Sequence, residues 1–155
     1  MVNKEIYDKL SALTEREKEL LKNKNFSHVF KKSINKEFFK DNYISIEKHT
    51  RFIKTPKHSH NFIELAYVFS GNMTQKINEK EVNLKKGEMV LLNQFIEHEI
   101  DVTGQEDIII NFIIKPDFFD NIVSLLDGDN IISKFLLTSI YGGTRKGEYI
   151  NFHVG

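Results

Sequence analysis

Two histidines and a glutamate lie within seven residues of one another, at His58, His60 and Glu64. Neutral imidazoles and carboxylates are side chains that bind divalent ions such as Zn, Ni, Fe or Mn. On an extended strand, the i, i+2 spacing of the histidines predicts that both point to the same face. Glu64 lies inside an apolar run, where an unpaired carboxylate is costly, so we expect a cation, a donor or water beside it.

A single straight strand cannot bring these three side chains to one metal ion. At about 3.3 Å per residue, Glu64 would lie roughly 13 Å beyond His60. Metal–ligand bonds of about 2 Å cannot span that distance, so a shared site requires the chain to bend, and Asn61 is the favoured place. A second half of the site is expected between Gly87 and His98, which makes His98 the fourth candidate ligand.

The same residues allow two readings besides metal binding. They could be polar groups in the wall of an effector pocket, together with Asn111 and Gln75, among apolar neighbours. Such a pocket suits a small polar ligand, for example a sugar. They could also be structural hydrogen-bonding groups inside a filled barrel. The sequence leaves these alternatives open.

The composition indicates one globular domain and excludes several functional classes. The chain has 155 residues, of which 40% are hydrophobic, and its 22 basic residues equal its 22 acidic ones. An overall basic bias typical of nucleic-acid binders is therefore missing. Cysteine is absent, which excludes disulfides, thiolate metal ligands and a cysteine nucleophile. We find no apolar signal segment or membrane span in the sequence and predict a cytoplasmic protein.

Short apolar segments and turns predict a mainly β protein with helices at both ends. Helices are expected within 3–23, where Thr14-Glu15-Arg16-Glu17 forms a capping box, within 117–126 and within 130–141. Strands are expected at 42–49, at the run ending in Gly71, in a hairpin of 73–78 and 81–84, and at 88–92, 108–114 and 148–154. Many short strands at close spacing favour an antiparallel barrel or jelly roll.

Two sequence motifs resemble those of cupins. The segment His58-x-His60-x3-Glu64-x6-Gly71 resembles the first cupin motif, with Phe52 in place of its leading glycine. Gly87-x10-His98 resembles the second motif in a degenerate form, because Asn93, Phe95 and Val102 replace its proline, glycine and asparagine. The resemblance covers roughly residues 42–114 and implies a cupin barrel, also called a double-stranded β-helix.

The sequence of residues 58–71 resembles that of the N-terminal sensor domain of AraC-family bacterial transcription regulators. The same resemblance extends to Leu84-x-x-Gly87-Glu88 and His98. This resemblance implies an arm at 1–33, an effector-binding barrel at 34–116 and dimerising or packing helices at 117–155. DNA would be bound by a separate C-terminal domain that this sequence lacks, so we expect no DNA binding by this chain. The alternative is a small metal-dependent cupin enzyme, an isomerase or dioxygenase.

The C-terminal helical segments are rich in large apolar side chains, more than two short surface helices need for packing on one side. Some of them are therefore predicted to contact a second chain, giving a homodimer. The residues concerned are Phe118, Phe119, Ile122, Val123, Leu125, Leu126, Ile131, Ile132, Phe135, Leu136 and Ile140.

Overall fold

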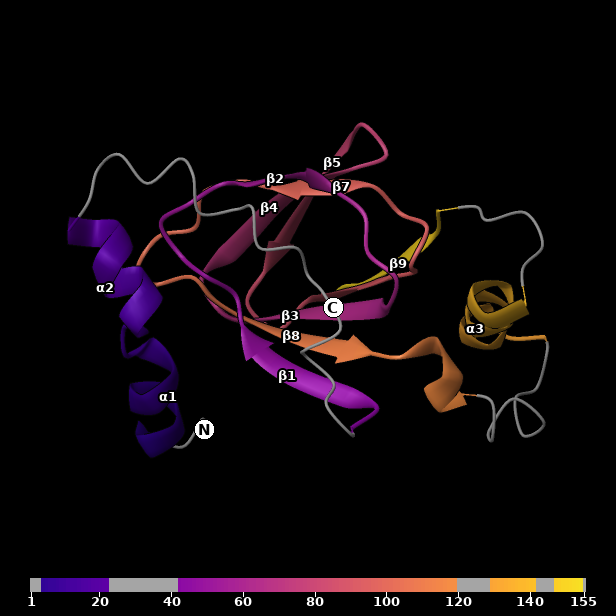
Figure 1. Cartoon of the computed structure of the whole chain (residues 1–155), viewed down its shortest axis with the longest axis horizontal. Coiled ribbons are helices and arrows are strands. Elements are labelled where there is room, and N and C mark those ends of the chain that lie inside the picture. The colour runs from indigo at the N-terminus through magenta and orange to yellow at the C-terminus, as the bar shows by residue number, and fades with distance from the viewer. Residues whose placement is uncertain (1–3, 23–41, 120–128, 142–146, 155) are drawn as a thin grey trace.

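The computed structural model describes residues 4–22, 42–119, 129–141 and 147–154. Two antiparallel sheets face each other (Figure 1), with helices at the two ends of the barrel. One sheet has the order β1-β8-β3-β6-β9 and the other the order β2-β7-β4-β5. Within these residues, no helix is both long enough and apolar enough to cross a membrane.

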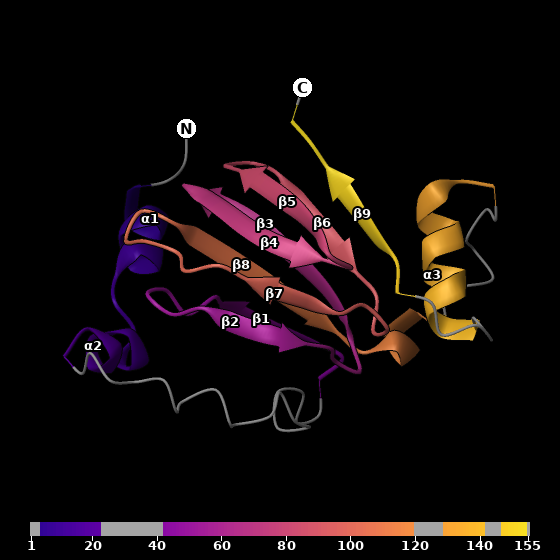
Figure 2. The same cartoon turned by 90° about the horizontal axis from the view of Figure 1, so that it is seen from above.

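Most elements follow the predicted order, but strands at 55–58 and 98–100 were not predicted. The helices are α1 (Lys4–Ser11), α2 (Glu15–Lys22) and α3 (Ile131–Tyr141), and a 3-10 turn, η3, covers Pro116–Phe119. The strands are β1 (Ile44–Lys48), β2 (Thr55–His58), β3 (Ile63–Ser70), β4 (Asn72–Ile77), β5 (Lys80–Lys85), β6 (Met89–Leu92), β7 (His98–Ile100), β8 (Ile108–Ile114) and β9 (Tyr149–Phe152). Figure 2 shows the strands from above, with α1 and α2 at one end of the sheets and α3 at the other.

Turn chemistry sets several of these boundaries. Asn78 and Glu79 both have positive φ, of 46° and 66°, which is the conformation of a type I′ hairpin turn between β4 and β5. The capping box is also formed, because the Thr14 amide donates to the Glu17 carboxylate at 2.8 Å and the Glu17 amide donates to Thr14 Oγ1 at 3.2 Å. Asn130 Oδ1 accepts from the Ser133 amide at 2.8 Å and caps α3.

Other predicted segments lie partly or wholly outside the residues that the structure describes. The helix expected from Asp117 to Leu126 begins as the 3-10 turn, and residues 120–128 lie outside the described ranges. Residues 23–41 and 142–146 also lie outside them. Pro56 is part of β2, which is an edge strand as its proline requires.

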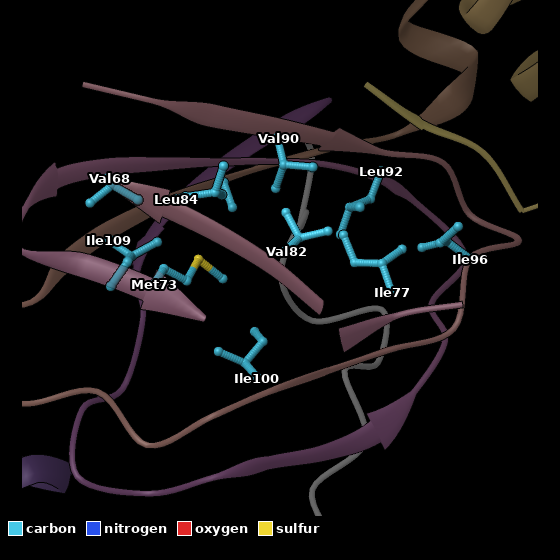
Figure 3. Packing of buried hydrophobic residues seen from close by; sticks show 11 residues of the cluster. Val68, Met73, Ile77, Val82, Leu84, Val90, Leu92, Ile96, Ile100 and Ile109 are labelled. Carbon is cyan, nitrogen blue, oxygen red and sulfur yellow. The ribbon is translucent and has the colours of Figure 1, made fainter. Parts of the chain in front are cut away.

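The apolar core fills the half of the barrel between β3, β6, β4 and β5. Alternate residues on these strands point inward, so side chains from both sheets meet, as Figure 3 shows. The labelled members are Val68, Met73, Ile77, Val82, Leu84, Val90, Leu92, Ile96, Ile100 and Ile109. The other half of the barrel, toward β1 and β2, carries polar side chains on the same inner face, and the candidate site lies there.

A second apolar cluster joins α3 to the five-stranded sheet. Phe135 and Leu136 of α3 pack with Ile63 of β3 and are 4% and 6% exposed. Ile131 and Ile132 on the same helix are exposed. Part of the apolar surface of α3 therefore covers the barrel, and part of it faces outward.

Candidate metal and ligand site

His58 and His60 do not lie on one strand, which corrects the prediction that both point to one face. His58 ends β2, whereas His60 lies in the turn that leads into β3. The physical reason is that β2 and β3 belong to different sheets, so the chain must cross from one to the other between them. This crossing is the bend expected near Asn61, and it brings Glu64, the second residue of β3, back toward the histidines.

Three of the four candidate ligands converge inside the barrel. The ligand atoms of His60, Glu64 and His98 all lie within 4.8 Å of one another. His60 Nε2 is 3.6 Å from Glu64 Oε2. The three residues are 9%, 5% and 1% exposed. The turn, β3 and β7 thus supply one ligand each to a buried cluster.

The imidazole hydrogen bonds leave the ligand atoms of this cluster available. His60 Nδ1 donates to the Phe62 carbonyl at 2.8 Å, and His98 Nδ1 donates to Gln75 Oε1 at 3.1 Å. In a neutral imidazole the second nitrogen then carries a lone pair. Both Nε2 atoms are buried without a hydrogen-bond partner. In metal-ligating histidines, one ring nitrogen typically donates a hydrogen bond to an oxygen and the other binds the metal. His60 and His98 have this arrangement, with Nδ1 hydrogen-bonded and Nε2 available.

The buried Nε2 atoms also test whether a divalent ion fits. Two neutral imidazole nitrogens and one carboxylate are a common ligand set for Zn and non-haem Fe, and also suit Ni or Mn. A bound ion would give both orphaned nitrogens a partner and would neutralise the buried Glu64 carboxylate. The residues present therefore fit such an ion, and three protein ligands leave positions for water or a ligand.

His58 lies beside this cluster rather than within it. Its ring centroid is 4.4 Å from that of His98, and it is half-buried. Its Nδ1 donates to the Pro56 carbonyl at 2.9 Å. His58 does not belong to the set of ligand atoms within 4.8 Å, but it does line the adjoining cavity.

The two amide candidates have different positions. Gln75 is 1% exposed and lies behind His98, where it orients the imidazole instead of lining the cavity. Asn111 lines the cavity, and its Oδ1 is buried without a partner. A buried amide oxygen normally has a hydrogen-bond partner, and for this oxygen the described residues provide none.

The cavity next to the cluster has a volume of about 140 Å³. Besides His58, Glu64, His98 and Asn111, it is lined by polar residues that the sequence did not single out, namely Arg16, Glu47, Lys48, His49, Thr50 and Thr55. Glu47 is the register partner of Asn111 across β1 and β8, so both share the inner face. The strand expected at 42–49 contains Glu47 and His49, but no pattern in the sequence indicates that their side chains would line the cavity.

Burial sets the protonation of these three side chains. Burial, followed by repulsion from Glu47, raises the pKa of Glu64 to about 7. Burial lowers the pKa of His60 to about 4, against an opposing effect of the Phe62 carbonyl. Burial and the neighbouring imidazoles lower the pKa of His98 to about 2. At neutral pH the imidazoles are therefore uncharged, as metal ligation requires, and only Glu64 still holds a proton part of the time.

Helix α2 contributes Arg16 to the cavity lining and is joined to the barrel by ion pairs. Glu17 accepts from Arg51 Nε at 2.8 Å and from Lys48 Nζ at 3.2 Å, and the Glu17 and Arg51 side chains are fully buried. Burial alone would raise the pKa of Glu17, but the hydrogen bonds from Arg51, Thr14 and Lys48 lower it to about 2. The preceding residue, Arg16, is exposed and lines the cavity.

The two antiparallel sheets form a mainly β barrel with this site inside it. Residues 43–114 match the model of the family described as Cupin domain, which covers both histidine-containing motifs. The matched range is close to the 42–114 that the motifs predicted. The match confirms the cupin resemblance and the mainly β fold, and it does not extend to the AraC branch.

Comparison with solved structures gives several proteins of low sequence identity. A cupin protein from Bacteroides fragilis is 21% identical, with 46% of this chain and 64% of that chain covered and a TM-score of 0.38. A protein from Thermotoga maritima described as a predicted oxalate decarboxylase is 24% identical, with 46% and 64% covered and a TM-score of 0.39. A bacterial pirin from Escherichia coli in complex with nickel(II) is 15% identical, with 70% and 39% covered and a TM-score of 0.43.

The chain spans less than two thirds of the length of the Bacteroides and Thermotoga proteins. No curated protein matches the chain.

Proposed function

We propose that the barrel is a metal-dependent receptor for a small molecule, in the role of the effector-sensing domain of an AraC-type regulator. A divalent ion would be held by His60, Glu64 and His98. The observation that carries the proposal is the pair of buried, unpartnered Nε2 atoms within 4.8 Å of the Glu64 carboxylate. The ion would supply positive charge and open positions for a ligand in the cavity.

The contact between α2 and the cavity supports sensing. Arg16 lines the cavity, while the neighbouring Glu17 ties the same helix to Arg51 and Lys48. A ligand that contacts Arg16 therefore also contacts an element outside the barrel. Its binding would change the free energy of α2 docking, as a sensor requires.

Metal binding is tested by loading the chelator-treated protein with Zn, Ni, Mn or, without oxygen, Fe. Isothermal titration calorimetry and elemental analysis should find one ion per chain for wild type. His98→Gln should lose the ion, whereas the matched control His153→Gln should retain it, because His153 is exposed and contacts only Glu88 among the bonds described for it. Wild type without a bound ion, or equal binding by the two variants, would contradict the proposal. Thermal melts show whether each variant is folded.

Ligand binding is tested by a thermal-shift screen of sugars and small metabolites, run with and without chelator. The proposal expects a ligand that raises the melting temperature of metal-loaded protein and has less effect after chelation. A ligand that acts equally in both conditions would support a receptor whose cavity works without metal.

A metal-dependent cupin enzyme is the second candidate, and Glu47 favours it. Glu47 lines the cavity, and burial raises its pKa against the opposing hydrogen bond from Ser45. A carboxyl of this kind can donate or accept a proton near the ligand. Conversion of a small metabolite that stops in Glu47→Gln, with the metal content unchanged, would establish the enzyme. Binding without conversion would favour the receptor.

Homodimer formation also belongs to the proposed receptor role. Ile131, Ile132 and Tyr141 of α3 are 67%, 42% and 63% exposed. Sedimentation at several concentrations should show self-association that Ile131→Ser weakens. A monomer at every concentration would contradict the dimer.

A further inference from the structure

The inner wall of the cavity along β1 and β8 carries polar atoms that the three metal-binding residues do not use. His49 directly follows β1 and is 8% exposed, and its Nε2 is buried without a hydrogen-bond partner among the described residues. Asn111 of β8 lines the same cavity, and its Oδ1 is also buried without a partner there. Buried polar atoms in native proteins almost always have partners. These two atoms therefore leave hydrogen bonds for a molecule in the cavity.

Strand pairing places these two residues beside the metal-binding cluster. The His49 amide donates to the Ile109 carbonyl at 2.9 Å, so Asn111, two residues farther along β8, is a diagonal neighbour of His49. On the other side of β8, the register with β3 makes Asn111 a diagonal neighbour of Glu64 as well. Diagonal neighbours on one face of a sheet lie about 7–8 Å apart. A ligand at the metal-binding residues can therefore reach Asn111 and His49 through a short chain of atoms.

We propose that His49 and Asn111 form a hydroxyl-binding half of the ligand site, and that the ligand is a short polyol held between this half and the metal-binding residues. This inference rests on the proposed receptor function and names the chemical class of its ligand. One hydroxyl group of the ligand would donate to Asn111 Oδ1. A hydroxyl group also suits His49 Nε2 in either tautomer, because it can both donate and accept.

The polar groups of this wall favour a ligand that donates hydrogen bonds. Asn111 Oδ1 is an acceptor, and the carboxyl of Glu47, its register partner, is an acceptor whenever it is ionised. Lys48 has no donor left for an anion, because its three ammonium hydrogens bind Glu17 and two backbone carbonyls at the C-terminal end of α1. An ammonium group would donate too, but a divalent ion in the cluster would repel it. Hydroxyl groups are therefore the donors that suit both halves of the site.

The size of the cavity limits the length of the polyol. Its volume of about 140 Å³ corresponds to about five water molecules, at roughly 30 Å³ each. Pockets for drug-sized ligands begin at about 300 Å³. The space therefore suits a polyol of about three carbons and favours a ligand smaller than a hexose.

The test uses the whole chain, loaded with Zn after chelator treatment, and three alcohols with the same carbon skeleton. Glycerol, 1,2-propanediol and 1-propanol differ by one hydroxyl group at each step. Titrations followed by NMR of the ligand should give the highest affinity for glycerol. Each lost hydroxyl should weaken binding by about fivefold, the effect of one neutral hydrogen bond. This series needs only the wild type, so it measures the hydroxyl dependence even where a variant fails to fold.

Two asparagines provide matched variants. Asn111→Leu removes the oxygen that faces the cavity and should reduce the preference for glycerol over 1,2-propanediol. Asn151→Leu removes an oxygen on β9 that is likewise buried without a partner but lies outside the cavity lining, and it should keep the wild-type preference. His49→Phe should weaken glycerol binding by about fivefold. A change in preference within the series is a readout that a general effect on folding does not produce.

Several results would overturn the inference. These are equal affinity for the three alcohols, equal preferences in Asn111→Leu and Asn151→Leu, or Zn-loaded protein that binds none of the alcohols, in which case water alone satisfies these atoms. The proposed metal site fails separately, if no Zn is retained. The same titrations are therefore repeated in chelator. A preference for glycerol there that Asn111→Leu abolishes would uphold the ligand class and contradict the role of the metal.

Discussion

The pKa of Glu64 predicts how many protons leave the protein when a divalent ion binds. Burial, and then repulsion from Glu47, raises this pKa to about 7, while those of His60 and His98 fall to about 4 and about 2. At pH 6 the carboxyl is then about nine-tenths protonated and both imidazoles are neutral. Since the ion binds the carboxylate, binding at pH 6 should release about one proton, and at pH 8 only about 0.1.

The sign of the pH dependence follows directly. Because the proton competes with the ion, affinity should rise with pH and level off above the pKa of Glu64. The expected change is about tenfold between pH 6 and pH 8. With unperturbed values near 4.3 for Glu and 6.5 for His, the histidines would instead release about 1.5 protons at pH 6 and Glu64 almost none.

Calorimetry in buffers with different ionisation enthalpies measures this proton count. Wild type and the surface control Glu19→Gln should release about one proton at pH 6. Glu64→Gln should bind more weakly and release almost none, because its two imidazoles are already neutral. The reasoning is refuted if Glu64→Gln still releases between one and two protons, since the histidines would then be the groups that titrate.

Three further predictions concern the residues around the site and the fold. Gln75→Leu should weaken metal binding by about 10–100-fold in calorimetry, because it removes the acceptor that orients His98; unchanged affinity would exclude this role. Glu17→Gln should lower the free energy of unfolding in urea by about 3–5 kcal/mol, because a fully buried guanidinium loses its charge partner. The wild-type contribution should be lost as pH falls from 4.5 toward 2, since the pKa of Glu17 is depressed. Gly71→Ala should lower the free energy of unfolding by more than about 1 kcal/mol, because φ is 72° and a Cβ there would lie 2.8 Å from backbone atoms. At Gly104 a Cβ would meet only a side chain, at 3.4 Å, so Gly104→Ala should melt close to wild type.

The order of strands and helices could be predicted from the sequence because local patterns determine it. The hairpin turn at Asn78-Glu79 and the capping box at Thr14 are encoded within a few residues, and both form as expected. The period-2 alternation identified strands, but it could not assign them to one of the two sheets. For that reason the spacing alone predicts His58 and His60 on one strand, although β2 and β3 belong to different sheets.

The site was only partly predictable for a related reason. His60, Glu64 and His98 follow recognisable spacing, and the structure brings them together. His49 and Arg16 carry no motif, because their part in the cavity arises from long-range packing. Arg16 enters the lining only because Glu17 binds Arg51, 34 residues away, and this contact docks α2.

The most direct test of the proposed metal centre is a crystal structure of the Zn-loaded chain, with diffraction data collected on both sides of the Zn absorption edge. The proposed site predicts one anomalous peak inside the barrel, about 2.0–2.2 Å from His60 Nε2, His98 Nε2 and a Glu64 oxygen. A peak bound only to surface residues, or a barrel in which these two nitrogens bind protein groups and no ion, would contradict it.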